Sequence, residues 1–231
     1  PGKILAGIRA LGISRVIEVG WGADVGSIHE AEEFLKEVPK YRDFLGTSCC
    51  PSWAMFAEKN FPEISENIAK THTPMVAAAK KIKHERPNAK VVFIGPCVSK
   101  KIEALNDDIR PYVDYVITFE ELMGLFSAKR IELSELEEEE FDSQSSRDGR
   151  NYAMAGGVAT AVVNVAKSIA PEREVKVMRA DTLKECRKIL TLAKAGKAKG
   201  CLLEGMACPG GCVGGPGTLL QPARAEKEVG A

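Results

Sequence analysis

The stretch K-V-V-F-I-G-P-C-V-S-K-K (90–101) shows how this chain is built. Residues 90–95 form a continuous apolar run of the kind found in buried strands of parallel sheets. The run ends at Gly95, a cysteine-bearing loop follows, and a helix beginning after Pro96 would complete the unit. The order of strand, loop and helix predicts an α/β protein whose chemistry lies at the ends of its strands.

The rest of the chain alternates in the same way. We expect further strands at 15–19, 112–119, 174–180 and 200–206, and helices at 3–11, 27–38, 51–64, 73–86, about 120–129, 157–170 and 183–195. Ser27 is the expected N-cap of the second helix. Strands separated by helices of this length predict mainly parallel sheets with right-handed crossovers.

The fold class predicted from this pattern is α/β, with two lobes of mainly parallel sheet flanked by helices and a site in the cleft between them. The predicted boundaries are 1–133 for the first lobe, 134–150 for an acidic linker and 151–231 for the second lobe. The acidic stretch lacks an apolar face and is rich in Ser, Asp and Gly, which favours an exposed linker. A docking site for a basic partner is the alternative.

Composition excludes several classes of function. The 32 basic side chains equal the 32 acidic ones, so no net field favours nucleic acid or an anionic membrane as partner. No apolar run approaches the roughly 18 residues of a membrane span, and the first residues do not resemble a signal peptide. We therefore expect a cytoplasmic protein. The chain begins at Pro1, which leaves open that it is a piece of a longer protein.

Five of the seven cysteines fall in three short motifs. These are T-S-C-C-P-S-W (47–53), I-G-P-C-V-S-K-K (94–101) and E-G-M-A-C-P-G-G-C (204–212). Each follows a strand or its equivalent, so the topology is expected to bring the three motifs together. An odd number of cysteines in a chain of this size favours metal-binding or buried thiols over disulfides. Cys186 and Cys201, outside the motifs, are interpreted as core or near-surface thiols.

The chemistry of these motifs favours an iron–sulfur centre. Thiolates are the ligands that such clusters prefer, and a cubane needs four. Cys208 and Cys212 can reach one cluster from a single loop, because Gly210 and Gly211 permit the positive φ angles that the loop requires. Zinc is one alternative, although its usual cysteine pair occurs twice and only one pair is present. A glycine turn with two structural cysteines is the other.

Two residues beside the expected ligands could act on what the cysteines hold. If a helix begins after Pro96, Cys97 and Lys100 share a face at its N-terminus, where thiolate, ammonium and helix dipole converge on one anionic object. The alternative is an ordinary solvated lysine pair. Cys49 and Cys50 are adjacent, so one can ligate while the other faces a pocket as a titratable thiol.

Taken together, the three motifs resemble the signature motifs of the [FeFe]-hydrogenase catalytic domain. The resemblance runs across nearly all of the chain and includes G-A-D (22–24) and A-G-G-V (155–158). In that family, four cysteines hold a [4Fe–4S] cubane, and one of them bridges to a diiron subsite that bears carbon monoxide, cyanide and a dithiolate. This subsite interconverts dihydrogen with two protons and two electrons.

The resemblance implies a role for each matching residue. The cubane ligands would be Cys50, Cys97, Cys208 and Cys212, with Cys212 as the bridge. The catalytic residues would be Lys100, which would hydrogen-bond a cyanide ligand, Cys49, which would deliver protons to the dithiolate, and Glu30 and Glu33, on a proton path with Glu103 near it. The cofactor contacts would be Lys100, Met206 and Gly95. On sequence alone, Glu30 and Glu33 could equally be ordinary exposed helix charges.

The chain also departs from the family pattern. Gly95 stands where the family has a methionine that contacts the bridging carbon monoxide, and Ala69 stands where a serine links the two carboxylates. Pro216 interrupts a run of glycines. These differences favour a divergent branch, similar to the sensory hydrogenases. A hydrogen sensor of low turnover is therefore one alternative to the enzyme.

A third class is the hydrogenase-like proteins of iron–sulfur assembly. Those tend to have a single cysteine in the first motif, so the pair at Cys49 and Cys50 argues against them. The expected partners are an electron carrier, since no ferredoxin-type C-x2-C-x2-C run is present, and the maturation proteins that build the diiron subsite. Dihydrogen and protons would be the reactants.

Overall fold

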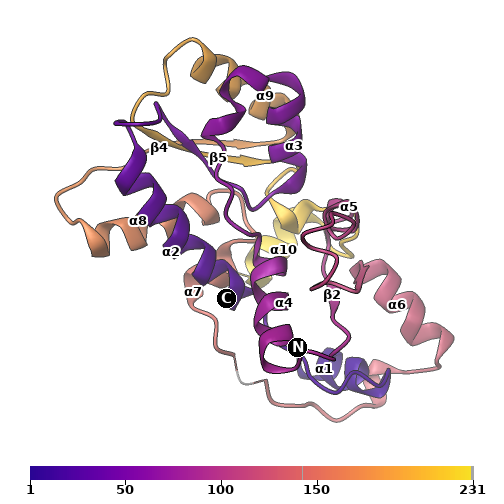
Figure 1. Ribbon diagram of the computed structural model, residues 1–231. Coiled ribbons are helices and arrows are strands. Elements are labelled where there is room, and N and C mark those ends of the chain that lie inside the picture. The colour runs from indigo at the N-terminus through magenta and orange to yellow at the C-terminus, as the bar shows by residue number, and fades with distance from the viewer. Residues whose placement is uncertain (142, 230–231) are drawn as a thin grey trace.

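Two separate parallel sheets form the frame of the molecule (Figure 1). The computed structural model describes residues 1–141 and 143–229. The larger sheet has the order β1 (Leu45–Gly46), β5 (Cys201–Met206), β4 (Lys176–Asp181), and the smaller one pairs β2 (Val92–Ile94) with β3 (Tyr115–Ile117). All of these pairings are parallel, which confirms the predicted α/β class.

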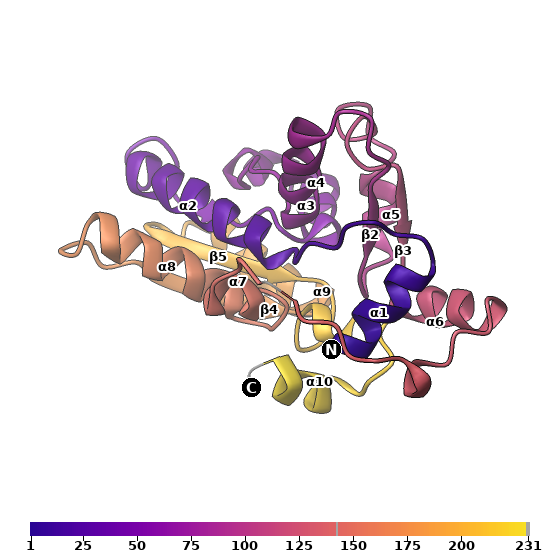
Figure 2. The ribbon, with the colours of Figure 1, turned by 90° about the horizontal axis from the view of Figure 1, so that it is seen from below.

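Helices cover both faces of the larger sheet. Neighbouring residues of a strand point to opposite faces, so Leu202 packs into one apolar cluster and Leu203 into another. The Leu202 cluster lies under α2 (Gly20–Glu37) and α8 (Gly157–Ile169), and the Leu203 cluster lies under α3 (Pro51–Asn60) and α9 (Leu183–Lys194). Figure 2 shows α2 and α8 running side by side. Strands buried on both faces explain why the sequence shows unbroken apolar runs.

The smaller sheet is covered in the same way by different helices. Val91 and Val113 pack with Met75 and Val76 of α4 (Pro74–Glu85). On another side, Ile94 and Ile117 join a cluster formed by α1 (Gly2–Ala10) and α6 (Phe119–Ala128). The remaining elements are η1 (Pro62–Asn67), α5 (Ser99–Glu103), η2 (Leu133–Glu135), α7 (Arg147–Asn151), η3 (Cys212–Gly214) and α10 (Pro222–Val229).

Two expectations about the N-terminal region are wrong. Residues 15–19 form no strand, because β-branched residues adopt a stable strand only where a partner strand and a surface to cover exist. The following helix begins at Gly20, so Ser27 is not its N-cap. The Ser27 hydroxyl instead donates to the carbonyl of Ala23, one turn earlier. The glycines in the first turns of α2 have a low helix propensity. They nevertheless allow close packing, since a Cβ at Gly22 would overlap Pro74.

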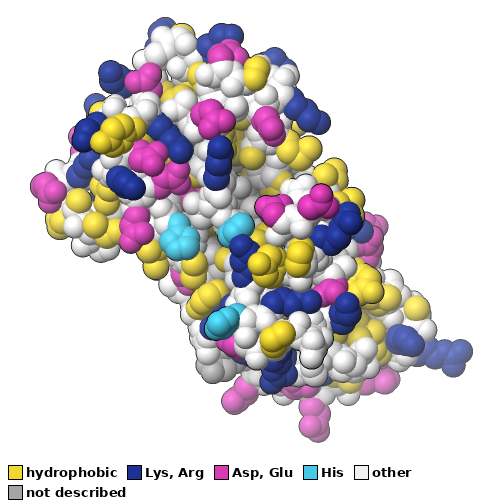
Figure 3. Space-filling view, in the orientation of Figure 1, with side chains coloured by type: hydrophobic (Ala, Val, Ile, Leu, Met, Phe, Trp, Pro, Cys, Tyr) yellow, Lys and Arg dark blue, Asp and Glu magenta, His cyan; other side chains and the backbone are white. Residues whose placement is uncertain are grey.

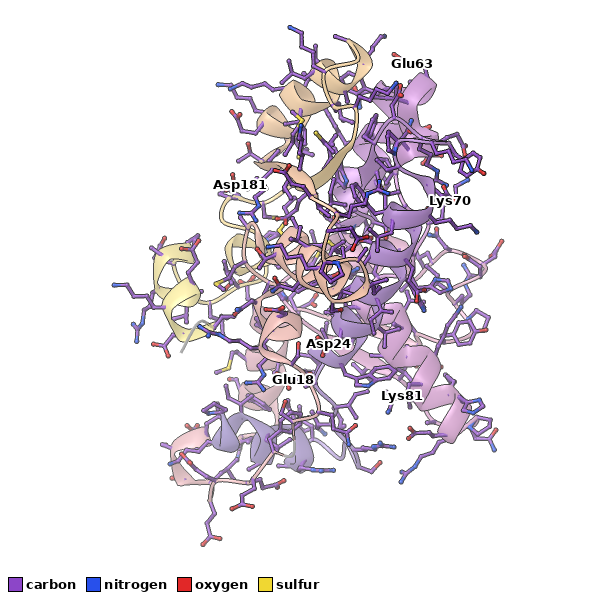
Figure 4. The ribbon with its side chains drawn as sticks, turned by 90° about the vertical axis from the view of Figure 1, so that its left-hand side faces the viewer. Glu18, Asp24, Glu63, Lys70, Lys81 and Asp181 are labelled. Atoms are coloured by element: carbon purple, nitrogen blue, oxygen red, sulfur yellow. The ribbon has the colours of Figure 1, made fainter. Side chains whose placement is uncertain are left out.

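The acidic segment is tied to the rest of the molecule at both ends. Lys3 donates to the Ser134 carbonyl across 2.8 Å, and the Ser146 amide donates to Asp24 of α2 across 2.8 Å. Asp24 is labelled in Figure 4. Within the predicted linker, residue 142 lies outside the described part of the chain, as do residues 230–231 of the second lobe. The lobe boundaries stay a prediction; the pairing of β1 with β5 joins strands from the two predicted lobes.

The face of the molecule seen in Figure 3 shows no segregation of charge. In Figure 3, acidic and basic side chains are interspersed over the visible face, in keeping with the equal numbers of each in the sequence. Among the helices within 1–141 and 143–229, none has the length and hydrophobicity needed to cross a bilayer.

Candidate iron–sulfur site

The first and third cysteine motifs leave the same edge of the larger sheet. Strand β1 runs parallel to β5, and the amide of Thr47 extends the ladder by donating to the Leu203 carbonyl across 2.9 Å. Cys50 then ends the first loop and stands at the N-cap of α3. Cys208 follows two residues after the end of β5. The carboxyl ends of two paired strands therefore place these two cysteines side by side, as the topology predicts.

The second motif comes from the other sheet and is joined to the third through backbone. Cys97 follows β2 and precedes α5. The amide of Gly217 donates to the Pro96 carbonyl across 2.9 Å. A Cβ at Gly215 would lie only 2.8 Å from that same carbonyl oxygen. The glycines after Cys212 are thus needed for close approach between the two motifs.

The loop between Cys208 and Cys212 has the backbone that the sequence predicts. Gly210 and Gly211 have φ angles of 71° and 94°, in the region that favours glycine. The Gly210 amide donates to Asp181, the last residue of β4, across 2.8 Å (Figure 4). This contact fixes the loop against the strand that lies beside β5.

The four cysteines predicted as ligands lie within electrostatic reach of one another. All four are free thiols and half-buried. The pKa of Cys212 is raised to about 12, chiefly by burial and next by charges on Cys50 and Cys97, while Lys100 opposes the shift. Burial also raises the pKa of Cys208, again with Cys50 and Cys97 adding to the effect. Crowded thiols of this kind ionise readily only when a metal centre takes up the negative charge.

This donor set fits a cubane better than a single ion. Within the described ranges, no three His, Cys, Asp or Glu side chains converge closely enough to hold one metal ion. A [4Fe–4S] cubane has no such need, because each of its four irons takes one thiolate at a separate corner. The arrangement agrees with the soft, four-thiolate set that iron–sulfur clusters prefer.

Cys49 faces a different environment from Cys50. It is half-buried and packs against an apolar cluster that contains Ala23, Tyr152 and Met206, the last of which is 2% exposed. Burial raises the pKa of Cys49 well above its usual value, and negative charge on Glu30 raises it further. The thiol therefore keeps its proton at neutral pH.

Lys100 is a buried ammonium with defined partners. Its Nζ lies 2.7 Å from Glu103 Oε2 and donates to the carbonyl of Cys49 across 3.4 Å. Glu103 also accepts from the hydroxyl of Thr73 across 2.8 Å. The pair spans one turn of α5, so Glu103 neutralises the lysine and holds it beside the first motif. The prediction that Lys100 is more than a solvated surface charge agrees with this burial.

Glu30 and Glu33 lie on α2 in different surroundings. Glu30 is 2% exposed; its Oε1 accepts from both the amide and the hydroxyl of Ser48, and no group among the described residues pairs with its Oε2. Burial raises the Glu30 pKa to about 7, with the Ser48 hydrogen bonds opposing. Glu33 is half-buried, with 20% of its side chain exposed, and it pairs with Arg42 across 2.8 Å. Its pKa is also raised, chiefly by burial. The alternative that Glu30 is an ordinary exposed helix charge is therefore wrong, because its side chain is buried.

Comparison with known proteins decides the family. Residues 1–216 match the family described as the iron-only hydrogenase large subunit, C-terminal domain. The chain belongs to this family. It is 26% identical over 265 residues to the periplasmic [Fe] hydrogenase large subunit of Nitratidesulfovibrio vulgaris, covering 96% of this chain and 63% of that one.

Relatives of a second kind match as well. The protein NAR1 of Arabidopsis thaliana is 23% identical over 293 residues, covering 98% of this chain and 62% of that one. A solved [FeFe]-hydrogenase, described for its stepwise H-cluster assembly, superposes with a TM-score of 0.79 at 25% identity, covering all of this chain and 77% of that one. The chain thus spans less than two thirds of the length of the two curated relatives and carries the hydrogenase-family fold.

The structure gives two departures from the hydrogenase pattern a physical setting. A Cβ at Gly95 would lie 2.7 Å from the ring of Phe93, so this ring occupies space next to the missing side chain. Ala69 is 5% exposed and packs in the apolar cluster with Ala31 and Phe34 of α2. Alanine has no hydroxyl that could bond either carboxylate.

Sequence reasoning missed several residues that organise this hydrogenase-family site. Ser48 and Thr73 hold the two buried carboxylates, and only Ser48 stands in a motif. Glu204 lies in the middle of buried β5, where its carboxylate accepts from the amides of Gly156 and Ala159 at the start of α8. A charge inside an otherwise apolar strand was the available signal for Glu204. Thr73 carries no comparable signal, because its partner is distant in sequence.

Proposed function

We propose that this chain carries the hydrogen-converting site of an [FeFe]-hydrogenase, where dihydrogen is interconverted with two protons and two electrons. A [4Fe–4S] cubane would be held by Cys50, Cys97, Cys208 and Cys212, with Cys212 bridging to a diiron subsite that bears carbon monoxide, cyanide and a dithiolate. When bound, this group supplies the dihydrogen binding and the electron storage. Family membership and the four-thiolate donor set support the assignment.

The observation that carries the proposal is the environment of Cys49. A cubane needs four thiolates, and Cys49 is a fifth cysteine next to one of them. Its pKa is raised, and it packs against the buried cluster that contains Met206. A protonated thiol beside a cluster suits proton delivery, since a purely structural cluster has no use for it.

The other site residues would act around this donor. Lys100, already neutralised by Glu103, would donate a charge-assisted hydrogen bond to an anionic ligand such as cyanide. Glu30 would exchange protons with Cys49, because a carboxyl with a pKa of about 7 can both give and take a proton near neutrality. Met206 and Gly95 would form part of the wall around the cofactor. Glu33 would connect the path to solvent.

A hydrogen sensor with slow turnover is the second candidate function. It is favoured by Ala69, which interrupts the link between the two carboxylates, and by Gly95, which offers no side chain to the cofactor. The similarity to NAR1 makes a role in iron–sulfur assembly the third candidate.

The partners of the proposed hydrogenase would be an electron carrier and the maturation proteins of the diiron subsite. Its location would be the cytoplasm.

Infrared spectroscopy after maturation separates these functions. Protein produced together with maturation proteins is expected to show bands of metal-bound carbon monoxide and cyanide and to reduce a redox dye with dihydrogen. Cys49→Ala is expected to keep the bands and lose about 100-fold or more in turnover, the typical contribution of one proton-transfer group. Cys201→Ala, which removes a buried thiol outside the motifs, is the matched control and should keep both.

Each outcome bears on one claim. Absence of both sets of bands would exclude the enzyme and the sensor and favour the assembly function. Bands with full activity in Cys49→Ala would show that this thiol is not the proton donor. Bands with slow turnover already in the wild type would favour the sensor.

A further inference from the structure

Two serine hydroxyls join the loops that carry Cys50 and Cys97. Ser52 is the second residue of α3 and Ser99 is the first residue of α5. Their Oγ atoms lie 2.5 Å apart, although the residues are 47 positions apart in sequence. Each serine stands two residues after a cysteine that the proposed function makes a cubane ligand. The same spacing on both sides places the hydroxyl pair next to both ligands.

This hydrogen bond joins two segments that follow strands of different sheets. Cys50 and Ser52 follow β1 of the larger sheet, and Cys97 and Ser99 follow β2 of the smaller one. A cubane bound by both cysteines must lie between the two loops, and the serine pair lies between them too. Helices α3 and α5 are also in contact as elements, so the hydroxyls belong to a packed junction and not to a chance surface meeting.

One hydroxyl proton of the pair has no hydrogen-bond acceptor among the described residues. A hydroxyl has one proton and two lone pairs, so one serine donates to the other and the acceptor keeps its own proton. Neither Oγ makes a second hydrogen bond to any group in 1–141 or 143–229. A half-buried hydroxyl with a free proton is a ready donor to an anionic sulfur.

We propose that the Ser52–Ser99 pair donates a hydrogen bond to the sulfur atoms of a cubane held by Cys50 and Cys97 and thereby raises the reduction potential of the cluster. The sign follows from charge: reduction adds an electron, so the donor stabilises the reduced cluster more than the oxidised one. One serine would contact the cluster and the other would orient it, and either one, with its partner removed, can rotate away. The inference rests on the cubane of the proposed function but not on the diiron subsite or on hydrogen chemistry.

The test uses the full chain carrying the cubane alone, rebuilt from iron and sulfide under anaerobic, reducing conditions. The readout is the midpoint potential of the cluster, followed by electron paramagnetic resonance during a redox titration. Ser52→Ala and Ser99→Ala are each expected to lower it. At the wild-type midpoint, the ratio of oxidised to reduced cluster should rise about fivefold, the factor that corresponds to one hydrogen bond of about 1 kcal/mol.

Two further variants make the result specific. Ser52→Thr keeps the hydroxyl and should keep a potential close to that of the wild type. This variant also controls for the effect of a substitution at position 52 on cubane binding. Ser168→Ala removes an exposed hydroxyl that donates to the Val165 carbonyl on α8, and it should change nothing. Wild-type potentials in both alanine variants at Ser52 and Ser99 would overturn the inference and leave the pair as a structural tie. A wild-type chain that binds no cubane would overturn the proposed function as well.

Discussion

The carboxylate of Glu30 is held on one side only: its Oε1 accepts from the amide of Ser48 across 2.8 Å and from the Ser48 hydroxyl across 2.9 Å. Ser48 in turn donates to the carbonyl of Thr71 across 2.7 Å. Because Oε2 is buried without a partner among the described residues, the charged form of Glu30 is costly and its pKa rises to about 7.

The first prediction is a dependence of stability on pH to which Glu30 contributes. The pKa is about 4.5 unfolded and about 7 folded, so the folded chain binds the extra proton between these values. The stabilising contribution of protonated Glu30 should therefore be fully present below about pH 4.5 and be lost as pH rises towards 7. The loss from this group is about 3 kcal/mol, at 1.36 kcal/mol for each pKa unit.

Glu30→Gln removes the titrating group and should remove this part of the slope. Urea unfolding of the metal-free chain at pH 5 and pH 8 measures the free energy of unfolding in each variant. Glu32→Gln, at an exposed position on the same helix, should follow the wild type at both pH values. If Glu30→Gln kept the wild-type slope, the burial argument for Glu30 would be wrong.

The second prediction concerns proton transfer in the matured protein. Glu30→Gln should lower dihydrogen turnover about 100-fold or more, because no solvent reaches the buried carboxyl to replace it. Glu33→Gln should lower turnover less, since 20% of the Glu33 side chain is exposed and water can substitute for it. Dye reduction by dihydrogen measures both, and equal losses would contradict this difference in exposure.

The third prediction uses the buried pair of Lys100 and Glu103. Glu103→Gln leaves the ammonium without its counter-charge, so the metal-free chain should lose about 3 kcal/mol of stability. The double variant Lys100→Met, Glu103→Leu removes both charges and should recover most of that stability. It should nevertheless lack activity after maturation, because the cation proposed to hold the cyanide ligand is gone. Chemical denaturation and dye reduction provide the two readouts.

Sequence patterns gave the fold to the extent that local signals decide it. The long helices and the strands at 174–180 and 200–206 were predicted because an apolar period or run marks them, and parallel pairing is confirmed. The strand predicted at 15–19 failed because a β-branched run is not enough without a partner. Strand β1 has only two residues, which is too short for a strand pattern to be recognised in the sequence. Only its pairing with β5 defines it.

The site residues that belong to sequence motifs could be predicted. The residues that contact the site from distant positions in the sequence could not. Cysteine motifs at strand ends indicated which thiols would meet, because topology fixes where strand ends lie. The hydrogen bond from Thr73 to Glu103 joins residues 30 positions apart. The pair of Ser52 and Ser99 joins residues 47 positions apart. Such contacts depend on how helices pack, which no local pattern records.

The fourth prediction tests whether close packing under β5 places the third motif. Gly205 lies one residue before Met206, and a Cβ there would overlap the ring of Trp53, which is 0% exposed. Trp53 cannot move freely, since its ring nitrogen donates to the Thr47 carbonyl across 2.9 Å. Gly205→Ala should therefore cost about 3 kcal/mol by overpacking and shift the first and third motifs relative to each other.

A second glycine on an open surface provides the matched control. Gly124 lies in α6, and a Cβ there would meet nothing within 4 Å. Gly124→Ala should raise stability by about 0.5–1 kcal/mol, because alanine is the better helix former. Thermal unfolding of the metal-free chain gives the two shifts, which should have opposite signs. A Gly205→Ala variant as stable as the wild type, with unchanged uptake of a rebuilt cubane, would show that contact between β5 and Trp53 does not set the position of Cys208.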